Sequence, residues 1–136
     1  MRVDPYLFLN GRCEEALTFY RDVLGAQIEA MIRFADMPGG PPGAGDRIMH
    51  AVLRIGETTV LASDGQAEGP VTFGGFSLAL TAPDDSTTER VFASLADGGA
   101  VRMPLMATAF SSRMGMVTDR FGAPWMIVTA PQSASA

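Results

Sequence analysis

The same order of secondary-structure signals occurs twice in this chain of 136 residues. The first copy reads strand, helix, strand, strand, strand over residues 5–9, 13–24, 27–34, 47–55 and 57–64. The second copy has the same order over residues 72–82, 84–99, 100–105, 109–119 and 124–130. Phe19 to Gly25 and Phe92 to Gly98 have equal spacing, so the two copies repeat with a fixed period. We therefore predict an α+β fold of two tandem β-α-β-β-β units, with a single α+β domain of coincidental similarity as the alternative.

Local signals support individual elements of both copies. Apolar residues recur at helical spacing over residues 13–24, and Gly25 follows as a helix-ending residue. Ser86 and Glu89 have the spacing of a capping box, which predicts the start of the second helix. Gly56 alone separates two strand-like runs, which predicts a β-hairpin.

The expected domain organisation follows from these elements. We predict one domain over residues 1–130, with unit one at 3–64, a linker at 65–71, unit two at 72–130 and a frayed tail at 131–136. The segment 35–46 is rich in Gly and Pro and reads as a loop. Whether this loop closes over a site or contacts a partner chain stays open at this stage.

Composition excludes several classes of function. The net charge is −5, and the basic residues do not cluster, so we expect no nucleic-acid partner. No apolar run reaches the ~18 residues of a membrane span, so we expect no membrane segment. The single Cys13 fits a reducing compartment. We expect a cytoplasmic protein.

Three stretches carry a resemblance to a known family. PYLFLNGRCEEALTFYRDVLG, DRIMHAVLRIG followed by VLASD, and GMVTDRFGAPWMI are similar to the PhnB-like branch of the vicinal oxygen chelate superfamily, which includes glyoxalase I, bleomycin-resistance proteins and extradiol dioxygenases. The resemblance implies a glyoxalase-like fold, in which the two units form a curved mixed sheet around a central cup. It also implies helices on the outside and pairing of two chains as a homodimer.

Some PhnB-like proteins carry a demethylubiquinone methyltransferase label. We do not expect that activity, because the sequence has no glycine-rich loop between a strand and a helix that could hold a nucleoside cofactor.

The resemblance also gives four positions where metal enzymes of the superfamily carry His, Glu or Gln ligands. These positions fall at Pro5, Leu61, Gly75 and Met126, none of which is a metal ligand of the expected kind. We therefore predict a metal-free cup and no cofactor. A divalent metal held by His50 and Asp64 with waters is the alternative.

Strand alternation, anchored on those positions, predicts which side chains line the cup. Met49, Ala51, Leu53 and Ile55 should face the helices, and Ile48 should face the cup with its alternate neighbours. The predicted ligand-binding residues are Leu7, Leu9, His50, Val52, Arg54, Leu61, Ser63, Ser77 and Met126. Thr59, Ala79 and Val128 should face the cup as well, and Trp125 should point away from it. This lining is mainly apolar, which is typical of a small-molecule pocket.

Two residues are candidates for catalysis. His50 is the only histidine, and its role is structural, ligand-contacting or catalytic. Arg54 could pair with an anionic group of a ligand. Asp64 ends a strand before a glycine, which fits a turn role better than a catalytic one. Cys13 lies at a helix start and is expected to be a small buried residue rather than a nucleophile.

Two functions remain. The first is a small-molecule binding protein of the bleomycin-resistance type with a metal-free cup. The second is a lyase, isomerase or dioxygenase that works through a metal or through acid–base groups. The sequence does not identify the ligand.

Overall fold

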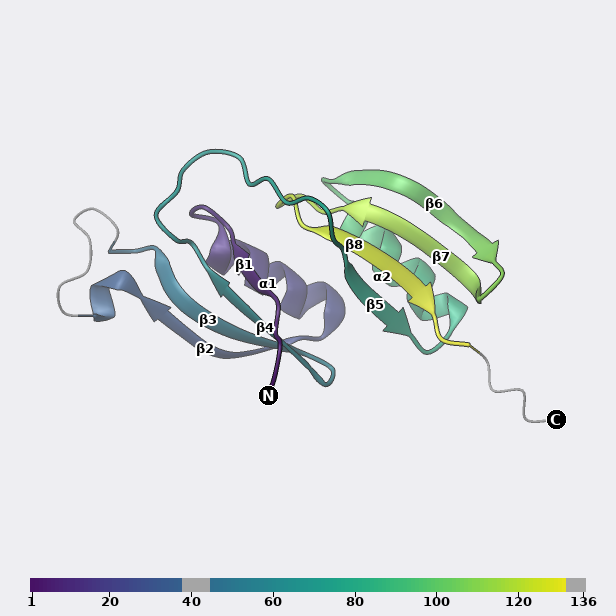
Figure 1. Ribbon diagram of the computed structural model, residues 1–136, viewed down its shortest axis with the longest axis horizontal. Coiled ribbons are helices and arrows are strands. Elements are labelled where there is room, and N and C mark those ends of the chain that lie inside the picture. Colours follow the sequence, from purple (N-terminus) through teal and green to yellow (C-terminus); the bar gives the residue numbers. More distant parts are fainter. Residues whose placement is uncertain (38–44, 132–136) are drawn as a thin grey trace. The chain divides into compact units, whose positions relative to one another are not determined.

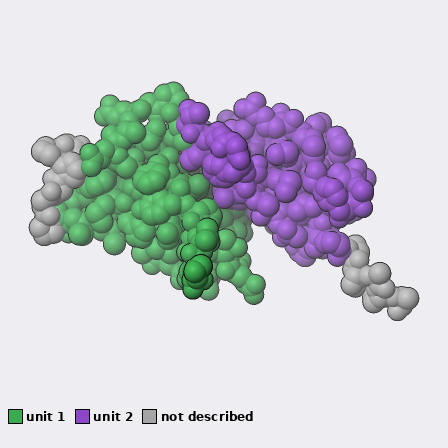
Figure 2. Space-filling model, viewed as in Figure 1, with its two compact units in different colours: residues 1–71 green, residues 72–136 purple. Residues whose placement is uncertain are grey.

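The computed structural model describes residues 1–37 and 45–131, and it divides into two compact units, residues 1–71 and 72–136 (Figure 2). Each unit consists of a four-stranded sheet with one long helix packed on one of its faces (Figure 1). Residues 38–44 of the expected Gly/Pro loop and residues 132–136 of the expected tail lie outside the described residues. No helix in the described ranges is long and apolar enough to cross a membrane.

The first unit has the predicted β-α-β-β-β order, with one short addition. Its elements are β1 (Tyr6–Phe8), α1 (Cys13–Leu24), β2 (Gln27–Arg33), the 3-10 turn η1 (Phe34–Asp36), β3 (Ile48–Ile55) and β4 (Thr58–Ser63). The strand order is β1-β4-β3-β2. The β1–β4 pair is parallel, and the β2–β3 and β3–β4 pairs are antiparallel.

The second unit repeats this topology. Its elements are β5 (Leu78–Ala82), α2 (Asp85–Ala96), β6 (Ala100–Thr108), β7 (Ser111–Thr118) and β8 (Pro124–Thr129). The strand order is β5-β8-β7-β6, again with the first and last strands of the unit parallel and the other pairs antiparallel. The duplicated α+β fold predicted from the sequence is confirmed.

Helix α1 has the predicted bounds because its apolar residues fall on one stripe. Ala16, Leu17 and Tyr20 are buried against the sheet, while the residues between them are more exposed. The helix ends at Gly25, whose φ of 68° is the left-handed conformation that glycine adopts without steric cost. The predicted helix end is therefore confirmed.

Helix α2 begins at Asp85, one residue after the predicted start at residue 84, but the predicted capping box is wrong. The N-cap is Asp84, whose side chain accepts a hydrogen bond from the backbone N–H of Thr87 at 2.8 Å. Ser86 lies inside the first helical turn, so the Ser86/Glu89 capping box does not form. The Asp84 carboxylate accepts from a free backbone N–H group at the start of the helix, which is the role expected of the Ser86 hydroxyl. Asp84 lies nearer to the preceding strand than Ser86 does.

Strand β5 is shorter than the predicted run 72–82. Pairing with β8 begins at Leu78, opposite Trp125, and no strand is assigned to residues 72–77. Gly75 in this segment has a φ of 75°, which is not an extended-strand conformation. Residues 72–77 therefore form a loop, although their apolar and small residues alternate as in a strand.

Candidate functional site

The two faces of the sheet in the first unit differ in what covers them. Strand register places Leu7, Ala62, Ala51 and Met31 in one row, and the first three are almost fully buried on the side where α1 packs. We call the opposite side the open face. It carries a second row across all four strands, formed by Tyr6, Leu61, Val52 and Ala30.

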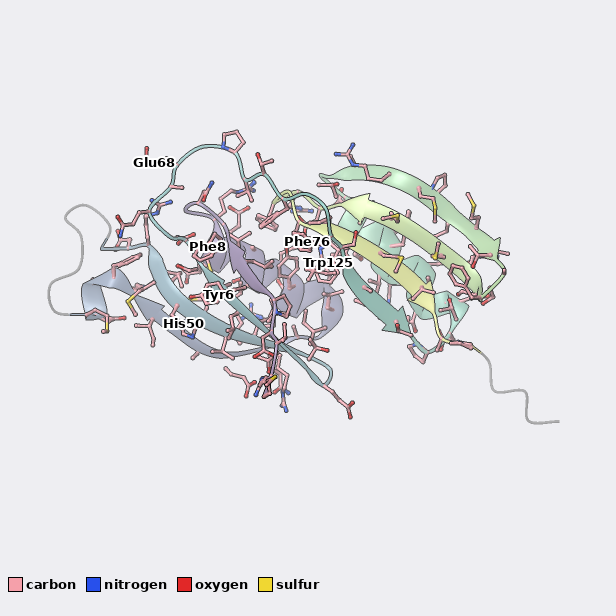
Figure 3. The ribbon with its side chains drawn as sticks, viewed as in Figure 1. Tyr6, Phe8, His50, Glu68, Phe76 and Trp125 are labelled. Atoms are coloured by element: carbon pink, nitrogen blue, oxygen red, sulfur yellow. The ribbon has the colours of Figure 1, made fainter. Side chains whose placement is uncertain are left out.

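An aromatic cluster lies on the open face. The rings of Tyr6 and Phe8 are stacked, with centroids 4.9 Å apart and planes at 21°. The ring of His50 lies beside them, 5.7 Å from the ring of Tyr6 (Figure 3). Tyr6 and Phe8 keep 38% and 52% of their surface exposed, so this cluster offers an accessible aromatic surface.

A hydrogen bond joins Tyr6 to His50. The phenol oxygen lies 2.9 Å from Nδ1 of the imidazole, across a sequence separation of 44 residues. Burial raises the pKa of the Tyr6 phenol, with a smaller contribution from the thiol of Cys13. The phenol therefore keeps its proton at neutral pH and is available as a donor.

The predicted orientation of Leu7 and Leu9 is wrong. They are 2% and 0% exposed, and Leu7 shares a row with Ala62 on the helix-covered side. Residues 5–9 are apolar at nearly every position, so alternation alone cannot say which set faces which side. Sequence reasoning missed Tyr6 and Phe8 for this reason, although two aromatic residues at a spacing of two were the available signal.

Ile48 also faces the opposite side from the one predicted. It is 1% exposed, whereas His50 and Val52 are half-buried on the open face. The register pairs Ile32 with His50 but Arg33 with Ile48, so Met49 is an extra residue in β3. This bulge reverses the alternation at the start of the strand.

Arg54 lies on the open face, as its alternation with Val52 predicts, but it is already occupied. Its Nη2 donates to the side-chain oxygen of Gln27 at 2.6 Å, and its Nε lies 3.7 Å from Oε1 of Glu29. The guanidinium has protein partners on the neighbouring strand. The predicted pairing with an anionic ligand would have to compete with these two contacts.

Asp64 has a structural environment. Its Oδ1 accepts from the backbone N–H groups of Gly11 and Cys13 at 2.7 and 2.8 Å, and its Oδ2 accepts from that of Ile48 at 2.8 Å. The side chain is 2% exposed. This carboxylate joins the start of α1 to the start of β3, which fits the structural role.

Ser63 is engaged in the same way. Its Oγ donates to the carbonyl of Ile48 at 3.2 Å and accepts from the backbone N–H of Gly65 at 2.9 Å, and the residue is 3% exposed. It lies beside Phe8 in the sheet register. Its predicted contact with a ligand stays a prediction.

Cys13 is buried, and its thiol has a raised pKa. Burial raises the pKa of its thiol to about 12, with a further contribution from the nearby negative charge of Asp64. The thiol is fully protonated at neutral pH. The expectation of a small buried residue agrees with its 0% exposure.

The second unit has a comparable uncovered face. In strand β8, Trp125, Ile127 and Thr129 are buried, while Met126 and Val128 alternate with them and are half-buried. Ala79 pairs with Met126 and shares its side of the sheet. Ser77 lies one residue before β5. The ligand-binding roles of Met126 and Ser77 stay predictions.

The four family metal positions do not provide a ligand set. In the sheets, Leu61 pairs with Tyr6, the residue after Pro5, and Met126 pairs with Ala79, four residues after Gly75. Across the described ranges 1–37 and 45–131, no three His, Cys, Asp or Glu side chains are grouped so that they could hold a metal ion. The residues present do not fit the divalent metal of the superfamily's enzymes.

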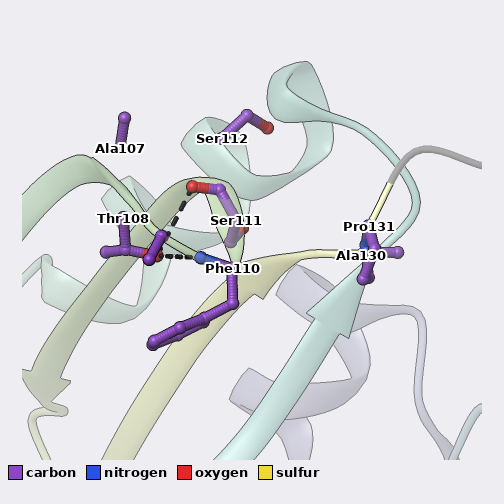
Figure 4. Close-up of a pocket in the computed structure, with 8 residues that line it drawn as sticks. Ala107, Thr108, Phe110, Ser111, Ser112, Ala130 and Pro131 are labelled. Atoms are coloured by element: carbon purple, nitrogen blue, oxygen red, sulfur yellow. Dashed lines mark hydrogen bonds between the residues drawn. The ribbon is translucent and has the colours of Figure 1, made fainter. Parts of the chain in front are cut away.

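A shallow pocket of about 570 Å³ lies at one end of the second unit (Figure 4). It is lined by the turn between β6 and β7 and by the end of β8: Ala107, Thr108, Ala109, Phe110, Ser111, Ser112, Ala130 and Pro131. The hydroxyl of Thr108 donates to the carbonyl of Ser111 and accepts from the N–H of Phe110, each at 3.4 Å. These bonds are internal to the turn.

Comparison with known proteins places this fold in a family. The sequence profile described as the Glyoxalase/Bleomycin resistance protein/Dioxygenase superfamily matches residues 2–127. The protein YjdN of Escherichia coli K12 is 32% identical over 143 aligned positions, which cover 97% of each chain.

Two solved structures resemble the chain over almost its whole length. The crystal structure of protein PA1353 from Pseudomonas aeruginosa is 40% identical, with a TM-score of 0.87 over 96% of this chain and 98% of that one. A PhnB protein from Bacillus cereus, described as a putative 3-demethylubiquinone-9 3-methyltransferase, is 26% identical, with a TM-score of 0.82 over 96% of this chain and 100% of that one. The duplicated β-α-β-β-β topology and these matches agree: the chain belongs to the Glyoxalase/Bleomycin resistance protein/Dioxygenase superfamily and resembles its PhnB-like members.

Proposed function

We propose that this protein binds a small, flat, mainly apolar molecule on the open face of its first unit. The observation that carries the proposal is the stacked, half-exposed pair of Tyr6 and Phe8 beside His50. Leu61 and Val52 extend this surface as an apolar row, and Arg54, a basic residue on the same face, is paired with Gln27 and Glu29. Aromatic surface with few polar groups favours binding of a conjugated ring system.

A direct test is titration with an aromatic probe. Naphthyl methyl ketone is added to the isotope-labelled full-length protein, and amide chemical shifts map the contact. We expect perturbations on β1, β3 and β4, and about tenfold weaker binding in Phe8→Ala, because one stacked ring is lost.

Phe110→Ala is the matched control, since Phe110 is an exposed phenylalanine of the second unit. It should leave the affinity of the probe unchanged. Absence of binding, or equal losses in Phe8→Ala and Phe110→Ala, would contradict the proposal.

We propose that binding requires no metal. The support is that Pro5, Leu61, Gly75 and Met126 carry no imidazole, carboxylate or carboxamide donor. Metal analysis of protein purified without chelator, and melting temperatures measured with added zinc, nickel or manganese, test this directly. A stoichiometric metal that stabilises the fold would overturn it.

A second candidate function is acid–base catalysis, and the Tyr6–His50 hydrogen bond is the observation that favours it. A phenol–imidazole pair can relay a proton near neutral pH. The same ketone reports on this function, because its methyl protons exchange with deuterium only when a base removes them. Protein-dependent exchange that disappears in His50→Gln would indicate an enzyme, and absence of exchange would favour simple binding.

We do not carry the methyltransferase description of the Bacillus cereus structure over to this chain. Neither unit has a doubly wound parallel sheet, since each contains a single parallel pair of strands. The turn before α1 contains one glycine, Gly11, and the turn before α2 contains none. These connections offer little backbone for the phosphates or ribose of a nucleoside cofactor. A cofactor-binding titration with S-adenosylmethionine is expected to show no saturable binding.

A further inference from the structure

The hydrogen bond between Tyr6 and His50 determines which nitrogen of the imidazole carries its proton. Nδ1 lies 2.9 Å from the phenol oxygen, and either atom could in principle donate. An imidazole nitrogen is a much stronger acceptor than a phenol oxygen, and a phenol, whose ordinary pKa is 10.0, keeps its proton at neutral pH. The phenol therefore donates to Nδ1, and the neutral ring of His50 carries its proton on Nε2.

The Nε2–H group has no hydrogen-bond partner in the part of the chain that the structure describes. Among residues 1–37 and 45–131, His50 makes no hydrogen bond other than the one with Tyr6. The residue is half-buried and lies on the open face, in register with Ile32 of β2. A polar donor in this position is available to an acceptor atom of a bound molecule.

The surroundings of His50 limit the charge of that molecule. The nearest basic residue on the same face of β3 is Arg54, whose guanidinium is bound to Gln27 and lies near the carboxylate of Glu29. An anionic ligand would lose its hydration without gaining an unpaired cation. The stacked rings of Tyr6 and Phe8 add apolar, flat surface next to the donor.

We propose that Tyr6 is a positioning residue that fixes His50 as an Nε2–H donor, and that the open face thereby selects flat, uncharged, conjugated molecules with a carbonyl oxygen. This inference rests on the proposed binding function and deepens it. One hydrogen bond from Nε2–H to the carbonyl provides the selectivity, and the stacked rings provide most of the affinity. Tyr6 contributes to both through separate parts of its side chain, the ring and the hydroxyl.

The first experiment is nitrogen NMR of the imidazole. Because the chain has a single histidine, its two ring-nitrogen signals need no assignment by mutation. In the neutral ring we expect Nδ1 without a proton and Nε2 with one. Tyr6→Phe keeps the ring but removes the hydroxyl, and the Nδ1 signal should then move to the position of an unbonded nitrogen. A proton on Nδ1 in the wild type, or an Nδ1 signal that Tyr6→Phe leaves in place, would overturn the proposal.

The second experiment compares two probes of the same shape. Naphthyl methyl ketone has the carbonyl, and ethylnaphthalene lacks it. We expect the wild type to prefer the ketone about tenfold, which is the effect of one buried hydrogen bond. In Tyr6→Phe the preference should fall to about twofold, with the affinity for ethylnaphthalene unchanged, because the stack is retained. The anion naphthoate should bind more weakly than the ketone.

The outcomes separate this inference from the proposed function. If both probes bind with equal affinity and Phe8→Ala weakens both, the binding function stands and the carbonyl selectivity is refuted. If the preference for the ketone survives in Tyr6→Phe, the positioning role of Tyr6 is refuted. If neither probe binds, or if Phe8→Ala changes nothing, both proposals fall.

Discussion

The indole Nε1 of Trp125 donates a hydrogen bond of 2.8 Å to Oδ2 of Asp119, and both residues are 3% exposed. The other oxygen of this carboxylate accepts from the backbone N–H groups of Phe121 and Ala123 at 2.9 and 3.0 Å. One buried side chain therefore holds the β7–β8 turn and orients the only tryptophan of the chain. Removal of the carboxylate takes this acceptor away from all three donors.

We expect Asp119→Ala to lower the free energy of unfolding by about 2–4 kcal/mol, because three buried donors lose their acceptor. Chemical denaturation followed by the fluorescence of Trp125 measures this change. Asp22→Ala is the control, since Asp22 is exposed and paired with its neighbour Arg21. An Asp119→Ala protein as stable as Asp22→Ala would show that water replaces the carboxylate.

A second prediction concerns Asp64 in the first unit. Asp64→Asn keeps the size of the side chain but turns an NH2 group towards one of the three backbone N–H groups that the carboxylate now accepts. We expect a loss of about 2–3 kcal/mol in the free energy of unfolding. Hydrogen exchange of the amides of Gly11, Cys13 and Ile48 should become faster. Unchanged exchange at all three would contradict the structural role.

Cys13 gives a prediction in alkaline solution. Its thiol has a raised pKa of about 12 in the folded protein, against 9.0 for an unperturbed thiol. Between these values the unfolded chain has lost the proton while the folded chain retains it. The contribution of this thiol to the free energy of unfolding is therefore complete below pH 9 and is lost as the pH rises towards 12.

The measurement is urea unfolding as a function of pH in wild type and Cys13→Ala. We expect the stability of the wild type to fall more steeply above pH 9 than that of the variant, which lacks the thiol. Parallel curves would mean that the thiol is not buried as described. A thiol reagent should also react with Cys13 only on unfolding.

Gly115 gives a packing prediction for the second unit. A Cβ atom at this buried position would lie 2.5 Å from the ring of Phe92 and 3.0 Å from both Leu105 and the carbonyl of Met103. We expect Gly115→Ala to destabilise the protein by about 1–3 kcal/mol, because the ring and the strand must move. Gly74→Ala is the control, since a Cβ there meets no atom within 4 Å.

A partial rescue makes this prediction more specific. In the background of Gly115→Ala, Phe92→Leu shortens the side chain that is in the way and should recover part of the stability. The melting temperatures of the two single variants and of the double variant give the coupling between the two positions. Additive effects would refute a direct clash.

The fold was largely predictable because its signals are local. The apolar stripe and Gly25 define helix α1, and Gly56 defines the β3–β4 hairpin. The same reasoning failed at Ser86, because the cap is provided by Asp84, and both residues are good N-cap types. Short polar residues in succession do not indicate which one takes the cap.

The candidate site was less predictable, because it depends on strand register. Val52 and Leu61 were placed on the correct side by alternation, and Leu7 and Leu9 were not. The orientation of β1 is set by its pairing with β4, which lies more than fifty residues away, and not by a local pattern. The bulge at Met49 is likewise a property of the β2–β3 pairing. Tyr6 therefore became visible as a partner of His50 only in the folded sheet.

The parallel pairing of β1 with β4 has a consequence for the order in which the first unit assembles. The β2–β3 and β3–β4 pairs join strands that are neighbours in the sequence. The amide and carbonyl groups of β1 can bond to β4 only after the rest of the unit has formed, because the two strands are far apart in the sequence. We expect pulse-labelled amides in β3 to gain protection from exchange before those of Leu9 and Leu61, which bond to Ser63 and Pro5 across this junction. The aromatic surface on β1 would then be completed by the last step of folding, so a chain trapped before that step would have a formed hairpin and no binding surface.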